Sequence, residues 1–195
     1  MSYRIIMNRI LIISYIFLIG LISCNNSDKS IDKLGIAKKY FEALDKSNSS
    51  KIKTLLTDSL ITAIPKYGYE VTFSRSDYIE KWLKWDSIFE PSYKILEMEL
   101  ENGNVKAKVS KSDKRIYFLM QKPFHTNEVL RFQNDKIIAV ETEYLNFDKT
   151  TWEKNKNRLL NWIEENNPEL NGFIYDQTES GAKKFLKAIE LYEKK

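Results

Sequence analysis

The stretch LEMELENGNVKAKV, residues 96–109, decides the fold, because it predicts a β-hairpin whose register can be worked out in full. Asn102-Gly103 is the strongest short hairpin signal, since a two-residue type I′ turn needs positive φ at both positions. Counting outward from this turn gives four cross-strand pairs: Leu100–Val105, Glu99–Lys106, Met98–Ala107 and Glu97–Lys108. One face is apolar and the other matches opposite charges, and a slip of one residue would exchange the two faces. We expect the charged face to be solvated, not to form a catalytic set of carboxylates.

Further strands are expected on both sides of this hairpin. Residues 60–73 carry a Pro and a Gly at their centre and predict two short strands around a turn. Residues 128–132 and 136–144 predict two more strands, joined at Gln133-Asn134-Asp135. The apolar run 115–120 is interpreted as a continuation of the second hairpin strand after a bend. Together these segments predict a meander of antiparallel strands.

Helices are expected before the strands. Apolar residues recur at three- and four-residue spacing over residues 31–46, which predicts an amphipathic helix with Ser30 as its N-cap. A short second helix follows, with Ile52, Leu55 and Leu56 facing inward. A third helix begins at Ser74, which forms a capping box with an Asp three residues later, and it stops before Pro91. Helices followed by a run of strands indicate the α+β class, with the helices on one face of a curved sheet.

The chain resembles the nuclear transport factor 2-like (NTF2-like) superfamily, which includes SnoaL-like and ketosteroid isomerase-like proteins. The resemblance covers residues 31–148 and is carried by AKKYFEAL at 37–44, SRSDYI at 74–79 and FQNDKII at 132–138. Asp135 stands where the family pattern usually has glycine, and Asn134 can supply the positive φ of that turn. The resemblance implies a cone, a bent antiparallel sheet wrapped around N-terminal helices, with a pocket at its open end. It implies little about chemistry, because this fold hosts enzymes, ligand binders and assembly modules.

Two residues are candidates for acid–base chemistry. Glu128 shares strand parity with Leu130 and Phe132, so its carboxyl points to the apolar side, where burial would raise its pKa. If Glu128 instead lies at the end of the sheet, its carboxyl reaches water. His125, the single histidine, is the second candidate, because imidazole is a common general base. It lies close to Pro123 and Thr126, which is typical of a loop or a strand edge.

Other reaction types lack their residues. A single histidine and no free thiol after Cys24 give no metal site, and no cofactor is expected. No serine has the GxSxG context of a nucleophile elbow.

Five aromatic residues are candidates for lining a ligand pocket: Tyr40, Tyr67, Trp82, Trp85 and Tyr144. Aromatic residues at such spacings also build cores, so packing is the alternative role for all five.

The final segment, residues 149–195, predicts two further helices. Thr150 or Thr151 caps the first, which ends before Pro168, and Thr178 opens the second. Their apolar positions recur at helical spacing: Trp152, Leu159, Leu160 and Ile163, then Ala182, Phe185, Leu186 and Ile189. Two amphipathic helices need a surface that buries them, so we expect them to pack on the exposed sheet face or to cover a partner. Packing on the sheet face would favour a monomer or a weak dimer.

The N-terminus carries the parts of a secretory signal peptide. Arg4 and Arg9 precede an apolar run over residues 10–22, which is shorter than the roughly 20 residues of a spanning helix. Leu21-Ile22-Ser23-Cys24 resembles the lipobox of bacterial lipoproteins, which implies cleavage before Cys24 and lipidation of its thiol. An uncleaved signal anchor is the alternative, and translation can start at Met1 or at Met7.

This resemblance predicts a domain order and a location. The order is a signal peptide at 1–23, a tether at 24–30, the cone domain at 31–148 and a helical extension at 149–195. Asn25 follows Cys24 where an aspartate would favour the inner membrane, so we expect a lipid anchor in the outer membrane of a bacterial envelope. Loss of the signal leaves 29 basic and 27 acidic side chains, a near balance that predicts no nucleic-acid partner.

The sequence favours a membrane-anchored binding module for a small apolar ligand or an envelope partner over an enzyme. The first alternative is a SnoaL-like isomerase, cyclase or hydrolase with Glu128 or His125 as its base. The second is an assembly component that uses the C-terminal helices as its interface. A pocket that holds Glu128 among aromatic rings would favour the enzyme, whereas a filled cone would favour assembly.

Overall fold

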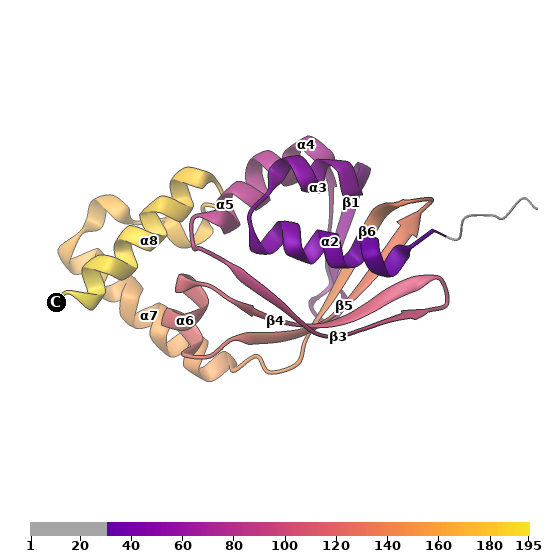
Figure 1. Ribbon diagram of the computed structural model, residues 1–195. Helices are drawn as coiled ribbons and strands as arrows, with labels where there is room; N and C mark the ends of the chain where they lie inside the picture. The colour runs from indigo at the N-terminus through magenta and orange to yellow at the C-terminus, as the bar shows by residue number, and fades with distance from the viewer. Residues whose placement is uncertain (1–30) are drawn as a thin grey trace, which may run out of the picture. The chain divides into compact units, whose positions relative to one another are not determined.

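The computed structural model describes residues 31–195, which form a curved, unclosed six-stranded sheet with helices on its concave side and at one end (Figure 1). The sheet order is β2-β1-β6-β5-β4-β3. The strands are β1 Leu56–Ile64, β2 Tyr69–Ser74, β3 Ser92–Glu101, β4 Asn104–Ser112, β5 Phe124–Gln133 and β6 Lys136–Tyr144. This mixed architecture confirms the α+β class predicted from the sequence.

The helices fall into two groups along the chain. The early helices are α2 Lys33–Asp45, α3 Ser49–Leu55 and a continuous helix made of α4 Arg75–Asp77, a π-helical turn Tyr78–Leu83 and α5 Lys84–Ser87. The later ones are α6 Lys114–Met120, α7 Lys149–Asn166 and α8 Glu179–Glu193. Single 3₁₀ turns occur at Pro65–Tyr67, Pro168–Leu170 and Phe173–Tyr175. Figure 1 shows α2 and α3 against the sheet, and α6, α7 and α8 at the end away from the β3–β4 turn.

The β3–β4 hairpin has the register predicted from its sequence. All four pairs counted outward from Asn102-Gly103 are present, and both turn residues have positive φ, 49° and 76°. The register shifts between Ile95 and Glu97, so Ile95 pairs with Val109 and Leu96 is left as an exposed bulge residue. The Nζ of Lys33 donates to the carbonyl of Gly103 at 2.8 Å and ties the start of α2 to this turn.

The sequence suggested a wholly antiparallel sheet, but one pair of strands is parallel. β1 pairs with β6 in parallel, although the two strands are separated by most of the domain. β1 also begins at Leu56, four residues earlier than expected, and a bulge lies between Leu56 and Ile61. The parallel pair joins the first hairpin to the edge of the later meander.

Two local expectations about helices are corrected. The N-cap of α2 is Asp32, whose Oδ1 accepts from the backbone N–H of Gly35 at 2.8 Å, so Ser30 does not hold that position. The run 115–120 lies in helix α6, not in a strand. Asp113 caps this helix, since its Oδ1 accepts from the N–H of Ile116 at 2.6 Å.

The C-terminal helices do not cover the outer face of the sheet. They pack on each other and on α5 and α6, around buried residues that include Phe89, Leu119, Phe173 and Phe185. The outer face keeps its charged side chains, with Arg131 paired to Glu141 across β5 and β6. The sequence argument for a monomer or a weak dimer required these helices to pack on the sheet face, so it no longer applies.

Several predictions concern residues outside the part of the chain that the structure describes. These are the signal peptide at 1–23, the choice between Met1 and Met7, lipidation of Cys24 and the tether at 24–30. Within residues 31–195, no helix combines the length and the apolar character that crossing a membrane requires.

Candidate functional site

A cavity of about 350 Å³ lies between the concave face of the sheet and the helices. The cavity lies where three apolar clusters meet. Tyr40 of its wall belongs to the main core, Trp85 packs against the C-terminal helical cluster, and Phe124 belongs to a small third cluster. The other polar and aromatic side chains of the wall are Phe41, Thr62, Tyr69, Tyr78, Trp82, Asp86, Tyr93, Lys111, Arg115, Thr126, Glu128, Thr142, Tyr144 and Gln177. The wall is therefore rich in aromatic side chains, and polar or charged side chains are almost as numerous.

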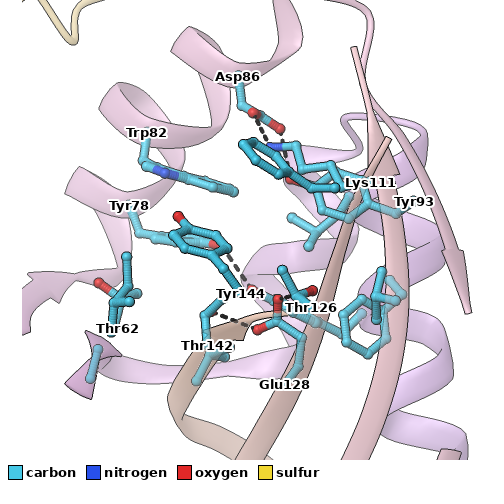
Figure 2. A pocket seen from close by; sticks show the side chains of 18 of the residues that line it. Thr62, Tyr78, Trp82, Asp86, Tyr93, Lys111, Thr126, Glu128, Thr142 and Tyr144 are labelled. Carbon is cyan, nitrogen blue, oxygen red and sulfur yellow. Dashed lines mark hydrogen bonds and ion pairs between the residues drawn. The ribbon is translucent and has the colours of Figure 1, made fainter. Parts of the chain in front are cut away.

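Glu128 lies on the cavity wall in the middle of β5, between β4 and β6 (Figure 2). Its Oε1 accepts from the hydroxyl of Thr126 at 2.9 Å, and its Oε2 accepts from the hydroxyl of Thr142 at 2.7 Å. Thr142 is the residue opposite Glu128 on β6, so strand register sets this contact. Burial raises the pKa of Glu128 to about 7, although both hydroxyl bonds and the more distant charge of Lys111 lower it.

Two tyrosine hydroxyls share a hydrogen bond in the same interior. The hydroxyl oxygens of Tyr40 and Tyr78 are 2.8 Å apart. Burial raises the pKa of both phenols well above the ordinary value of 10.0, so both hydroxyls keep their protons at neutral pH. One of these protons lies between the two oxygens, and the other is free to donate to a bound molecule.

A buried ion pair lies elsewhere in the wall (Figure 2). Asp86 is fully buried, and its Oδ1 accepts from the Nζ of Lys111 at 2.5 Å while its Oδ2 accepts from the hydroxyl of Tyr93 at 2.8 Å. The Lys111 ammonium also lies over the ring of Tyr93, 4.8 Å from its centroid, and over that of Trp82, at 5.5 Å. A lysine side chain is flexible, and these contacts fix the position of the Lys111 ammonium.

Arg115 and Trp85 occupy the end of the cavity nearest the C-terminal helices. The guanidinium of Arg115 pairs with Asp113 at 3.1 Å and lies 4.6 Å from the centroid of the Trp85 ring. Arg115 Nε and Trp85 Nε1 are buried and have no hydrogen-bond partner among residues 31–195. Both unpaired groups are hydrogen-bond donors, and both belong to residues that line the cavity.

The π-helical turn explains why two large aromatic residues face the cavity together. Tyr78 and Trp82 both lie on this turn, and their rings stack with centroids 4.9 Å apart. Such a turn inserts one residue into a helix and re-aims the side chains around it, and it occurs often at functional sites.

Four of the five aromatic residues suggested for a pocket line the cavity: Tyr40, Trp82, Trp85 and Tyr144. Tyr67 does not, because it lies on the 3₁₀ turn between β1 and β2 and 54% of its surface is exposed. Its ring lies next to that of Tyr144, which does line the cavity, with the two centroids 6.1 Å apart.

The structure separates the two candidate bases. Glu128 is inside the cavity in mid-strand, so the expectation that it reaches water at the end of the sheet is wrong. His125 has the opposite strand parity and does not line the cavity, and its backbone N–H donates to Oδ1 of Asn146 at 2.7 Å. Of these two candidates, Glu128 is the base that the geometry supports.

Several site residues were missed by the sequence reasoning. Asp86 interrupts the buried stripe of its helix, seven positions after Ile79 and three after Leu83, and an acid at such a position was a usable signal. Thr126 and Thr142 gave no comparable signal, because their contact with Glu128 exists only once β5 and β6 are paired. Within residues 31–195, no three potential ligand side chains of His, Cys, Asp or Glu gather as a metal site would require.

Comparisons with known proteins identify the fold and no more. No protein-family model matches the chain, and no curated protein is significantly similar to it. A solved protein from Kribbella flavida superposes with a TM-score of 0.50 at 11% identity, covering 66% of this chain and 97% of that one.

Two further neighbours give TM-scores below 0.5. A second Kribbella flavida protein, assigned as a candidate ketosteroid isomerase, gives 0.48 at 14% identity, covering 59% of this chain and 78% of that one. The epoxide hydrolase/cyclase-like enzyme SalBIII gives 0.49 at 13% identity, covering 58% and 90%. Other neighbours are described as NTF2-like proteins of unknown function. The curved, unclosed sheet with its helices matches the NTF2-like cone fold, which by itself assigns no activity.

Proposed function

We propose that the cavity is an acid–base catalytic site that moves a proton on a small, largely apolar substrate, with Glu128 as the group that carries the proton. The observation that supports this most is a carboxyl held by two threonine hydroxyls in an aromatic cavity, with a pKa of about 7. A carboxyl with a pKa near the working pH supplies both the base and the acid form in useful amounts. This reverses the preference for a non-catalytic module that the sequence alone suggested.

The proposed reaction is a proton transfer without redox change. The Glu128 carboxylate takes a proton from a carbon or hydroxyl of the substrate, and the resulting carboxylic acid returns it at another position, which gives an isomerisation or a ring closure. The free hydroxyl proton of the Tyr40–Tyr78 pair is suited to donate to a substrate oxygen that gains negative charge. Thr126 and Thr142 fix the plane of the carboxyl during both steps.

A generic carbon acid tests this role without knowledge of the natural substrate. A base that removes the C3 proton of 5-nitrobenzisoxazole breaks its N–O bond and releases a coloured cyanophenolate. We expect the wild-type protein to catalyse this reaction with a kcat/KM that rises with pH and reaches half its plateau near pH 7. The Glu128→Gln variant should lose about 100-fold, the lower range for a general base.

His125→Ala is the matched control, because this residue is the other candidate base and does not line the cavity. Its kcat/KM should equal that of the wild type. A wild-type rate no greater than that of Glu128→Gln would contradict the catalytic proposal.

Ligand binding without catalysis is the second candidate, supported by the size and aromatic lining of the cavity. Native mass spectrometry of the protein extracted from its own membrane tests it. A retained small molecule, together with a wild-type rate no greater than that of Glu128→Gln, would favour a binding module. The assembly alternative expected a filled cone, and the cavity gives it no support.

We also propose that the chain is tethered to a bacterial envelope membrane through a lipid on Cys24. The support is the basic and apolar order of residues 4–22 and the single cysteine that follows Ser23. Intact-mass measurement of the full chain, expressed in a bacterium, should find a mature form that begins at an acylated Cys24. The Cys24→Ser variant should keep its signal segment, and an unmodified Cys24 in the membrane fraction would contradict the proposal.

A further inference from the structure

A second polar centre lies in the cavity, away from Glu128, and the proton transfer does not use it. It consists of Asp86, Lys111 and Tyr93, which we call the lysine cluster. On the sheet, Lys111 pairs with Phe124, whereas Glu128 pairs with Ala107. The two centres are thus four residues apart in register, roughly 13 Å along the strands. Figure 2 shows them on different sides of the cavity, with the rings of Tyr78 and Trp82 nearby.

Lys111 has unused hydrogen-bonding capacity at the cavity wall. An ammonium has three N–H donors and no acceptor. Among residues 31–195, Asp86 is the group that accepts from Lys111, and the faces of Trp82 and Tyr93 flank the ammonium without offering a conventional acceptor. Because Lys111 lines the cavity, its remaining donors are available to an oxygen atom of a molecule bound there.

The charge of the lysine cluster restricts what that oxygen can be. Asp86 is fully buried and balances the Lys111 ammonium, so the pair carries no net charge. A carboxylate placed beside Lys111 would lose its hydration and would lie close to the Asp86 carboxylate, which costs free energy. A neutral carbonyl oxygen accepts the same hydrogen bond without either cost.

We propose that Lys111 is a substrate-binding residue that donates a hydrogen bond to a neutral carbonyl oxygen, and that Asp86 is the residue that positions it. The carbonyl belongs to the end of the substrate remote from the position where Glu128 acts. This rests on the proposed function insofar as the cavity holds the substrate. The proposal names the substrate class as uncharged carbonyl compounds with an apolar body long enough to reach both centres. A lysine cluster that only stabilises the fold would show no such preference.

Binding of three probes of nearly equal shape tests this selectivity. The probes are 2-acetonaphthone, its hydrocarbon analogue 2-isopropenylnaphthalene, in which CH₂ replaces the oxygen, and 2-naphthoate. Dissociation constants are measured by calorimetry at pH 6, where Glu128 is mainly protonated and adds little charge. We expect the wild-type protein to bind the ketone about tenfold more tightly than the hydrocarbon, the size of one hydrogen bond to a charged donor. The carboxylate should bind more weakly than the ketone.

The double variant Asp86→Asn/Lys111→Met removes the donor and keeps the cluster uncharged. It should bind ketone and hydrocarbon equally, with the hydrocarbon affinity unchanged within about twofold of the wild type. Glu128→Gln should keep the full ketone preference, so failure of the catalytic proposal and failure of this inference give different results. Far-ultraviolet circular dichroism establishes that each variant is folded.

Three results would overturn the inference. They are equal binding of ketone and hydrocarbon by the wild type, a ketone preference that survives in the double variant, and no saturable binding of any probe. The first and third need no variant, so the inference stays falsifiable even if the double variant does not fold.

Discussion

Two opposing effects act on the carboxyl of Glu128. Removal from water favours its protonated form, whereas the hydroxyl donors of Thr142 and Thr126 favour the carboxylate. Burial is the larger effect, and the pKa therefore stays above the ordinary value of 4.5, at about 7. The two threonines thus keep the group within the range where it can both accept and donate a proton near neutral pH.

Removal of one hydroxyl should raise the pKa of Glu128 further. We expect Thr142→Val to move the midpoint of the pH–rate profile with 5-nitrobenzisoxazole upward by about one pH unit, since a hydrogen bond to a charged group is lost. Thr62→Val is the control, because Thr62 also lines the cavity but donates to the carbonyl of Val71. A midpoint that stays in place or moves downward in Thr142→Val would show that the threonine does not stabilise the carboxylate.

The raised pKa of Glu128 also has a consequence for stability. A carboxyl whose folded pKa exceeds its unfolded pKa binds its proton more tightly in the folded state, so stability falls as the pH rises between the two values. Between pH 4.5 and pH 8, wild-type unfolding free energy should fall by up to about 3 kcal/mol relative to Glu128→Gln. Urea unfolding of both proteins at the two pH values measures this. A difference between the two proteins that does not change with pH would mean that the carboxyl is not protonated on burial.

Parity along β5 could have separated the two candidate bases from the sequence alone. Residues 126, 128 and 130 share one face, so His125 had to point away from any cavity that holds Glu128. The depth of Glu128 could not be predicted in this way, because it depends on β5 starting at Phe124, four residues after helix α6 ends at Met120. The sequence placed the start of this strand at Glu128, four residues too late, which left open a position for Glu128 at the end of the sheet.

Helix α6 shows why short apolar runs are ambiguous at the scale of one element. Five apolar or aromatic residues in a row, at 116–120, fit a buried strand and a buried helix equally well by periodicity. The deciding residue is Asp113, which lies just before the run and is 3% exposed, with its carboxylate on the N–H of Ile116 and on Arg115. The β3–β4 hairpin was predictable in contrast, because its turn and both of its faces favour one register.

Asp113 should contribute more to stability than an ordinary N-cap. Its loss removes the cap of α6 and leaves the partly buried guanidinium of Arg115 without its carboxylate. We expect Asp113→Ala to lower the free energy of unfolding by about 3 kcal/mol, and Asp113→Asn, which keeps a capping oxygen, to lower it by less. Chemical denaturation measures both.

Asp148 offers a matched comparison, since it caps α7 through the N–H of Thr151 and has no ion-pair partner among the described residues. Asp148→Ala should cost about 1 kcal/mol. Equal losses at the two positions would show that the pairing with Arg115 contributes nothing.

At the scale of the whole molecule, the cavity exists because the three apolar clusters meet without filling the space between them. The main core, the small cluster around Phe124 and the C-terminal helical cluster each supply part of its wall. The sequence predicted the apolar faces of these helices and strands, but a face does not reveal its partner. For this reason the C-terminal helices were expected on the sheet, whereas they complete the end of the cone beside Trp85 and Gln177.

This arrangement predicts that the C-terminal helices unfold together with the rest of the domain. Phe185 of α8 is 3% exposed, and its ring centroid lies 5.6 Å from that of Phe89, which follows α5 and contacts Trp85 in the cavity wall. Phe185→Ala should therefore lower the free energy of unfolding by about 3–5 kcal/mol while unfolding remains one transition. Tyr175→Ala, in the same segment but 87% exposed, should change it by less than about 0.5 kcal/mol. Tryptophan fluorescence and circular dichroism should follow one curve, because the residues that α8 packs on also carry the cavity wall. An early transition confined to the helical signal would instead make residues 149–195 an independent unit and would remove them from any part in forming the site.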